Sequence, residues 1–229
     1  MKKKSLIVLG ICLAMLSLQS CKPKPEQALL KSYFNAIRLD DITTMASMAL
    51  DPMKIEAESW KITQVSEEKI EPSNLRDLGQ KEIDLKKQFD ASSAPALDAK
   101  DALDLAKDEY TAARTAAARA AAKIKQDEAQ KKYDEAYEAN RALLKANNEA
   151  KEAAAKEEEL MGFSLGLRDL ANIRDLTGDM ATKDVQIEAV LKDGQTKNYK
   201  IYMKKYTMKD EAAGVVHRGR WVITKFETL

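Results

Sequence analysis

Cysteine, histidine and glycine are scarce in this chain, and their scarcity argues against several classes of function. The 229 residues include two cysteines, one histidine and eight glycines. Zinc sites are built from sets of cysteine, histidine and acidic ligands, so no metal site is expected. The 38 Lys and Arg residues nearly balance the 37 Asp and Glu residues without a basic block, which is not typical of a nucleic-acid-binding protein. The sequence therefore predicts no catalytic residue, no cofactor, no metal site and no nucleic-acid partner.

Long apolar runs are also rare, and the one clear example lies at the N-terminus. Leu6–Leu18 is apolar except for Gly10 and Ser17, and Lys2–Lys4 precede it. This run is shorter than the ~20 residues of a membrane-spanning helix, and with its basic start it is typical of a secretory signal peptide. It ends in Leu18-Gln19-Ser20-Cys21, which resembles the lipobox of bacterial lipoproteins. The alternative is an ordinary signal peptide in which the cysteine is incidental.

The lipobox resemblance implies a location for the protein. Residues 1–20 would be removed, Cys21 would be lipidated by a diacylglycerol and an N-acyl chain (palmitate, for example), and residues 21–25 would form a short tether. Lys22, rather than an aspartate after the cysteine, favours the periplasmic face of the outer membrane over the inner membrane. Removal of Cys12 and lipidation of Cys21 would leave no free thiol. Loss of three lysines would leave 35 basic against 37 acidic residues, a net charge of −2.

Two helices and a strand are predicted after the tether. In Glu26–Leu39, apolar residues recur at helical spacing. Asp40-Asp41 can cap a second helix, which carries Ile42, Met45 and Ala49 and is expected to end at Asp51-Pro52. Ser59–Ser66 then alternates with period two, which predicts a strand with Trp60 and Ile62 on one face.

The C-terminal part is predicted to be β-structure. Alternation begins at Asp184, and a second alternating run contains Tyr199, Ile201 and Met203. A two-residue loop would place the apolar residues of the two runs on opposite faces. We therefore expect a three-residue loop, Lys192-Asp193-Gly194, with Gly194 in the left-handed region and a bulge after it. Gly219–Phe226 is predicted to be the last strand.

This order of helices and strands resembles the nuclear-transport-factor-two-like, cystatin-like cone superfamily. The motifs are Tyr33-Phe34-Asn35-Ala36 with Asp40-Asp41 at the start and Gly219-Arg220-Trp221 at the end. The resemblance implies an α+β fold with a small cone-like antiparallel sheet, formed by 26–71 and 177–229. The remaining segment, 72–176, would be an insertion that this superfamily lacks.

The insertion is predicted to be helical and rich in alanine. Ser92-Ser93-Ala94-Pro95 is expected to break or kink it, and no glycine or proline occurs from Ala96 to Leu160. A heptad pattern runs through Leu103, Ala106, Tyr110, Ala113, Ala117, Ala120 and Ile124. A second pattern, in another phase, runs through Ala129, Tyr133, Ala136, Asn140, Leu143, Asn147, Ala150 and Ala154.

The change of phase favours an antiparallel, coiled-coil-like helical hairpin whose tip lies near Lys125–Glu128 and whose seam brings Ala113 close to Ala136. The alternative is a single protruding helix with a stutter in its heptads. In that case Ser92–Pro95 would be one reversal of the chain.

Other candidate functional residues have simpler explanations. His217, the single histidine, is expected in an exposed turn before the last strand. Tyr33, Tyr202, Tyr206, Asp40 and Asp41 could serve isomerase-like proton transfer, but Tyr33 fits a helix core and the aspartates fit a cap. Lys197, Lys200, Lys204, Lys205 and Lys209 are interleaved with tyrosines and could contact anionic lipid or cell-wall polymer; a solvated strand face is the favoured explanation.

Two functions remain open, and the first is favoured. The first is a non-enzymatic envelope lipoprotein, attached to the membrane through Cys21, whose helical arm acts as a spacer or binds another envelope protein. The second is a cone that binds a small apolar ligand or performs isomerase-like chemistry.

Overall fold

The structure, a computed structural model, describes residues 24–167 and 172–229. The predicted signal peptide, Cys12, Cys21 and the predicted lipobox lie outside the described residues. The fold is α+β, with an antiparallel sheet curled into a half-barrel and a long helical region.

The chain forms two compact units. Unit 1 holds the described residues up to Glu71, together with Met180–Tyr206 and Arg218–Leu229; unit 2 holds Pro72–Asp179 and Thr207–His217. The sequence predicted that all of 177–229 belongs to the sheet domain. In the structure, 177–179 and 207–217 belong to unit 2, which also contains the two long helices.

Two helices open unit 1. Helix α2 (Pro25–Arg38) buries Leu30, Tyr33, Phe34 and Ile37 on one face, as its spacing predicts. Helix α3 (Ile42–Ala46) is capped by the Asp41 side chain, which accepts a hydrogen bond from the Thr44 N–H at 2.9 Å. The predicted cap is thus confirmed, but the predicted length of α3 is wrong.

Helix α3 ends at Ala46 rather than at Asp51-Pro52. Ala49 lies beyond it and forms a parallel bridge with Ile223, whereas Ile42 is 69% exposed. The helix therefore ends before Pro52, because the residues that follow it pair with the sheet.

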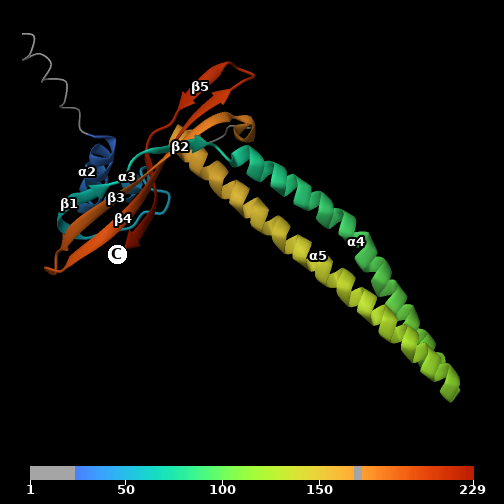
Figure 1. Cartoon of the computed structure of the whole chain (residues 1–229). Helices are drawn as coiled ribbons and strands as arrows, with labels where there is room; N and C mark the ends of the chain where they lie inside the picture. The colour runs from blue at the N-terminus through green and yellow to red at the C-terminus, as the bar shows by residue number, and fades with distance from the viewer. Residues whose placement is uncertain (1–23, 168–171) are drawn as a thin grey trace, which may run out of the picture. The chain divides into compact units, whose positions relative to one another are not determined.

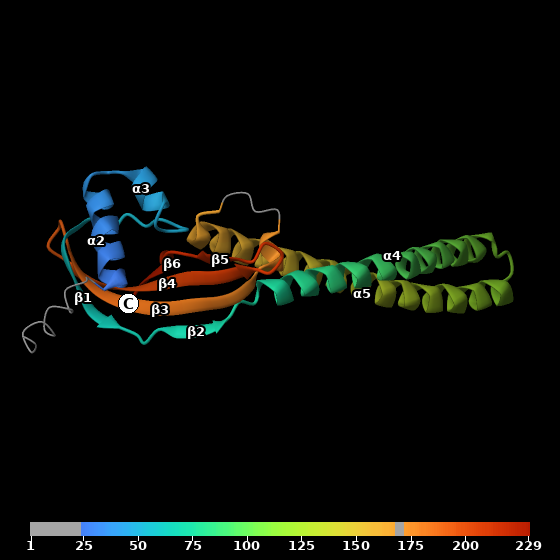
Figure 2. The ribbon, with the colours of Figure 1, turned by 90° about the horizontal axis from the view of Figure 1, so that it is seen from above.

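Six strands form one sheet (Figures 1 and 2). They are β1 (Ala57–Val65), β2 (Lys69–Pro72), β3 (Thr177–Leu191), β4 (Thr196–Asp210), β5 (Val215–Arg218) and β6 (Val222–Thr228). The order is β1-β3-β4-β5, β2 also pairs with β3, and β6 also pairs with β4. Strand β1 is antiparallel to β3, and strand β6 is antiparallel to β4.

The loop between β3 and β4 confirms the argument from register. The Gly194 N–H donates to the Leu191 carbonyl and the Leu191 N–H donates to the Gln195 carbonyl, which closes three residues, Lys192–Gly194. Gly194 has φ +81°, the left-handed conformation of a bulge of this kind. Val185, Ile187, Tyr199, Ile201 and Met203 are consequently all buried in one core.

The sequence missed two strands. Strand β2 is short and fully exposed, so it carries no alternation that could reveal it. Strand β5 includes His217, which was expected in a turn. Pairing with β4 makes this segment extended although its side chains are mostly exposed.

The insertion is an antiparallel helical hairpin (Figure 1). Helix α4 (Leu75–Ala112) and helix α5 (Ala116–Leu165) lie side by side in both ribbon views. The predicted tip at Lys125–Glu128 is wrong, because the chain reverses at Ala113–Thr115. There the extended backbone of Ala113 ends α4, and the Thr115 hydroxyl caps α5 by accepting from the Ala118 N–H.

Pro95 lies inside α4 and does not end it. A proline in a helix removes one hydrogen bond and crowds the preceding turn. The hydroxyls of Ser92 and Ser93 both donate to the Phe89 carbonyl, at 2.8 and 3.0 Å, in the turn just before. Of the predicted break or kink at Ser92–Pro95, the break is therefore wrong.

Burial along both helices follows heptads. In α5, every position of the second predicted pattern, from Ala129 to Ala154, is buried or half-buried. In α4, the pattern holds from Leu103 to Ala113 and extends back to Leu75. Beyond the turn, Ala117, Ala120 and Ile124 are exposed, because they belong to the second helix and not to a continued first one.

Candidate functional site

A register-defining hydrogen bond crosses the hairpin between two seam positions. The Asn140 amide donates to the Ser92 hydroxyl at 2.9 Å and to the Ser93 hydroxyl at 3.3 Å. A single polar pair inside an apolar seam favours one register, because a slip leaves buried polar atoms without partners. Asn147, two turns further along α5, has a buried Oδ1 atom that finds no partner in the described part of the chain.

One side of the hairpin carries exposed apolar side chains. An ion pair between Glu109 and Lys125, at 2.9 Å, marks the other side. Counting heptads from the seam places four large residues together on the side opposite that ion pair. We call them the apolar stripe, and their exposed fractions lie between 40% and 57%: Ile83, Leu97, Tyr137 and Leu144.

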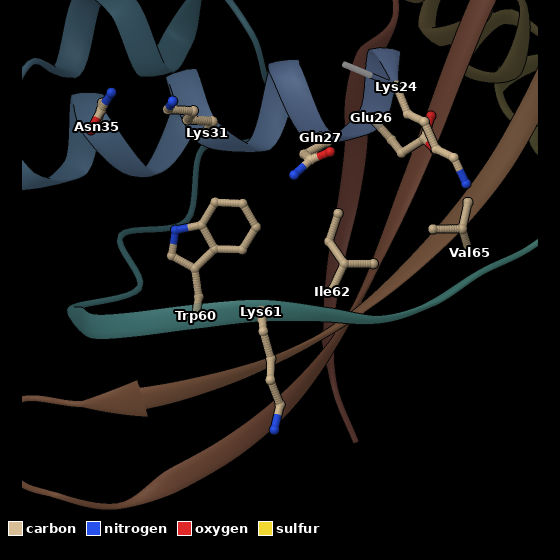
Figure 3. A pocket seen from close by; sticks show the side chains of 9 residues that line it. All are labelled: Lys24, Glu26, Gln27, Lys31, Asn35, Trp60, Lys61, Ile62 and Val65. Carbon is tan, nitrogen blue, oxygen red and sulfur yellow. The ribbon is translucent and has the colours of Figure 1, made fainter. Parts of the chain in front are cut away.

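A groove in unit 1 is the second candidate site (Figure 3). Its volume is about 730 Å³, and it lies between α2 and strand β1. Figure 3 shows Trp60 and Ile62 rising from β1 toward the helix, whereas the Lys61 side chain points to the other side of the strand. Phe34 stacks against the Trp60 indole with ring centroids 4.7 Å apart, which fixes the aromatic wall.

The helical wall of the groove is polar. Gln27, Lys31 and Asn35 follow each other at spacings of four residues, so they share one face of α2, and Lys24 lies just before the helix. Among the described residues, no carboxylate lies within 4.0 Å of either lysine, and no hydrogen bond engages either amide side chain. This wall therefore offers two positive charges and two amides to a ligand.

One lining residue of the groove, Glu26, belongs to a buried ion pair. Glu26, whose side chain is 4% exposed, lies 3.3 Å from the Lys183 ammonium, whose side chain is 11% exposed. Glu68 lies 3.6 Å from the same ammonium, and the Trp221 ring lies 5.1 Å from it. Lys205 approaches the Trp221 ring as well, at 5.0 Å. Because Glu26 is neutralised, Lys24 and Lys31 determine the charge of the groove.

Most of the lysine–tyrosine face is neutralised by neighbouring carboxylates. Lys200 pairs with Asp184 at 2.9 Å, Lys205 with Glu68 at 3.6 Å and Lys209 with Glu211 at 2.7 Å. The Tyr202 hydroxyl donates to Glu227 at 2.6 Å, and this hydrogen bond lowers the pKa of the Glu227 carboxyl. This arrangement is a charge-paired strand face, which agrees with the solvated interpretation.

Three of the residues considered for isomerase-like chemistry are each engaged by other groups. The Tyr33 hydroxyl donates to the Met53 carbonyl and accepts from the Met53 N–H, both at 2.9 Å, and burial raises its pKa to about 12. Asp40 pairs with Lys54 at 2.7 Å, which lowers the pKa of its carboxyl. Asp41 is engaged as the α3 cap, and the hydrogen bonds from Thr44 lower its pKa as well.

Tyr202 contacts Glu227 on the charge-paired face, Tyr206 is buried, and His217 is half-buried in β5. Within the described ranges, no group of three or more His, Cys, Asp or Glu side chains could hold a metal ion. None of the helices described is both long and apolar enough to cross a membrane.

Sequence reasoning missed the groove. The i, i+4 spacing of the polar residues on α2 was visible, but it is also the ordinary pattern of a solvated helix face. Only the position of β1 beside α2 turns this face into a wall.

Comparison with known proteins adds no identity. No protein-family model matches the chain, and neither the curated proteins nor the solved structures contain a significant match.

Proposed function

We propose that this chain is a non-enzymatic envelope lipoprotein, anchored through a lipidated Cys21, whose helical hairpin binds another envelope protein. The observation that supports the binding role is the apolar stripe. Single exposed apolar residues are common on protein surfaces, but large ones grouped on one face mark interaction sites. The partner is an amphipathic helix that lies along the hairpin and buries its own apolar face there.

The hairpin could also act as a spacer, in which its length and not its surface matters. The register provides a way to separate these roles. Residues 89–102 and 130–143 lie opposite each other and each comprise two heptads, as counted from the Ser92–Asn140 pair. Deleting both segments shortens the arm by about 21 Å and keeps the seam in phase.

A second variant keeps the length and changes the surface, with Leu97→Lys and Tyr137→Lys. Its matched control is Leu105→Lys with Ile124→Lys, which also replaces two exposed apolar residues but lies away from the stripe. Pull-down from membranes with mass spectrometry would compare the partners of all variants.

The docking role predicts that the stripe variant loses the partner and the control retains it. Loss in the shortened variant alone would identify a spacer. Retention of the partner by both the stripe and the shortened variants would refute a role for the arm.

The lipid anchor needs its own test. Cys21→Ser should release the protein from membranes, and mass spectrometry of the native protein should find an acylated N-terminal cysteine. Persistent membrane attachment of the variant would contradict anchoring through Cys21.

Ligand binding by the cone is the second candidate function, and the groove supports it, since 730 Å³ lies within the size range of small-molecule pockets. The polar character of its helical wall favours a charged ligand over the small apolar one expected from the sequence. An isomerase-like reaction has weaker support, because Glu26, the acid that lines the groove, is held by Lys183.

A further inference from the structure

The groove in unit 1 lies beside an open edge of the sheet. Strand β1 stands at the end of the strand order and pairs with β3 on one side. Within 24–167 and 172–229, no strand pairs with its outer side. An unpaired strand edge presents a row of N–H and C=O groups and readily accepts a further strand. At nine residues, β1 is longer than a typical strand of about five to six residues.

The walls of the groove complement such a strand. An extended segment that pairs with β1 would turn one face in the same direction as Trp60 and Ile62, toward α2, so that its side chains alternate between the groove side and the opposite side of the sheet. Side chains that enter the groove would meet Trp60 and Ile62 on the strand side and the Lys24 and Lys31 ammonium groups on the helix side. These groove walls would select every second side chain of the added strand by its charge and polarity, as pockets do in other cases of strand addition.

Charge decides which occupant fits. Lys24 and Lys31 have no carboxylate within 4.0 Å in the described residues, Glu26 is neutralised by Lys183, and Lys61 pairs with Glu188 at 2.7 Å on the other face. The groove is therefore net positive. A second copy that pairs β1 with β1 would bring four unpaired lysines together, which is unfavourable, so the occupant is a separate chain that carries acidic side chains.

We propose that this groove binds an extended, acidic peptide segment of a partner protein, which adds to the sheet as a strand beside β1. The proposal is independent of the hairpin and of the apolar stripe. It assigns recognition of the peptide backbone to the edge of β1 and selection of acidic side chains to Lys24 and Lys31.

The probe is a short fluorescein-labelled peptide of alternating glutamate and valine, and binding to the full chain is followed by fluorescence anisotropy. A lysine–valine peptide tests the charge. An acidic peptide N-methylated at alternate residues tests strand pairing, because the methyl groups block the hydrogen bonds of one edge. Hydrogen exchange reports on β1 directly, since its outward N–H groups should become protected.

The charge-reversal variant is Lys24→Glu with Lys31→Glu, and the control is Lys132→Glu with Lys151→Glu, two exposed lysines of α5 with the same change in net charge. We expect the acidic peptide to bind the native chain and the control equally, and to bind the charge-reversal variant at least about tenfold more weakly, as losing or reversing several charge contacts would produce. The N-methylated and basic peptides should not bind.

Several outcomes would overturn the proposal. These are equal binding of the N-methylated peptide, equal binding by the charge-reversal variant, and no binding of the acidic peptide up to millimolar concentration. Light scattering that finds a dimer with protected β1 amides would identify a second copy as the occupant instead. Protection outside β1, without protection of β1, would place the peptide elsewhere.

Discussion

Replacing Lys183 with methionine should destabilise unit 1 strongly, because it removes the partner of a buried carboxylate. The Glu26 side chain is 4% exposed, and among the described residues no other cation lies within 4.0 Å of it. Breaking a buried ion pair by removing one partner costs about 3–5 kcal/mol. That is a large part of the roughly 5–15 kcal/mol that stabilises a typical domain.

Removing the charge of the other partner, by Glu26→Gln, should lower the free energy of unfolding by less. Lys183 would retain Glu68 at 3.6 Å and the Trp221 ring at 5.1 Å, so we expect about 1–2 kcal/mol. Replacing both residues with methionine leaves no buried charge, and the loss should fall to about 1 kcal/mol, since an apolar pair often substitutes well for a buried ion pair.

Urea unfolding followed by tryptophan fluorescence measures this effect in the right place. Both tryptophans of the chain, Trp60 and Trp221, belong to unit 1. With a slope of about 2 kcal/mol per molar urea, Lys183→Met should lower the midpoint by roughly 2 M. Lys200→Met, on the charge-paired face, is the control and should shift it far less.

A double-mutant cycle built from Lys183→Met, Glu26→Met and the variant with both should give a coupling of at least about 2 kcal/mol. The reasoning is refuted if the two single losses simply add, or if Lys183→Met costs no more than Glu26→Gln.

Three further predictions concern the hairpin, a glycine and a tyrosine. In a background without Cys12 and Cys21, cysteines at positions 96 and 136 should form a disulfide within one chain, because both positions lie four residues toward the tip from the Ser92–Asn140 pair. Cysteines at positions 113 and 136 should not form one, since about 25 Å of helix separates them. The opposite result on a non-reducing gel would contradict this register. Gly178→Ala should cost roughly 2–4 kcal/mol in urea unfolding followed by circular dichroism, because a Cβ atom there would clash with the Thr207 carbonyl oxygen. Gly214→Ala meets no atom within 4 Å and should cost less, and equal losses would argue against this close approach. The free energy of unfolding should fall as pH rises from about 10 toward 12, because the Tyr33 hydroxyl keeps its proton in the folded chain, with a pKa of about 12, and loses it near pH 10 in the unfolded chain. This decrease in stability, up to about 1.4 kcal/mol per pH unit, should be absent from Tyr33→Phe. An unchanged slope of stability against pH in that variant would count against the prediction.

Local patterns predicted much of the fold. Helix α2 and the seam of α5 follow from apolar spacing, and the loop at Gly194 follows from parity between two alternating strands. The tip of the hairpin did not follow, because the turn at Ala113–Thr115 contains no glycine, proline or asparagine. The signal that could have placed it is Thr115, whose hydroxyl caps α5.

Most residues of the candidate sites could not be predicted from the sequence. Glu26 and Lys183 are 157 residues apart, so their pairing depends on the fold and leaves no local pattern. Lys24 and Lys31 resemble any solvated lysines until β1 lies beside α2. The apolar stripe needed the correct register of the hairpin, which the predicted tip did not give.

The two ends of the hairpin insertion meet at one hydrogen bond, in which the Ser73 N–H donates to the Gly178 carbonyl at 2.8 Å. Whatever length of chain lies between these residues, the entrance and the exit stay in the same place. Evolution can therefore add or remove matched heptads here without disturbing the strands, and we expect related chains to share the sheet while differing in the reach of this segment.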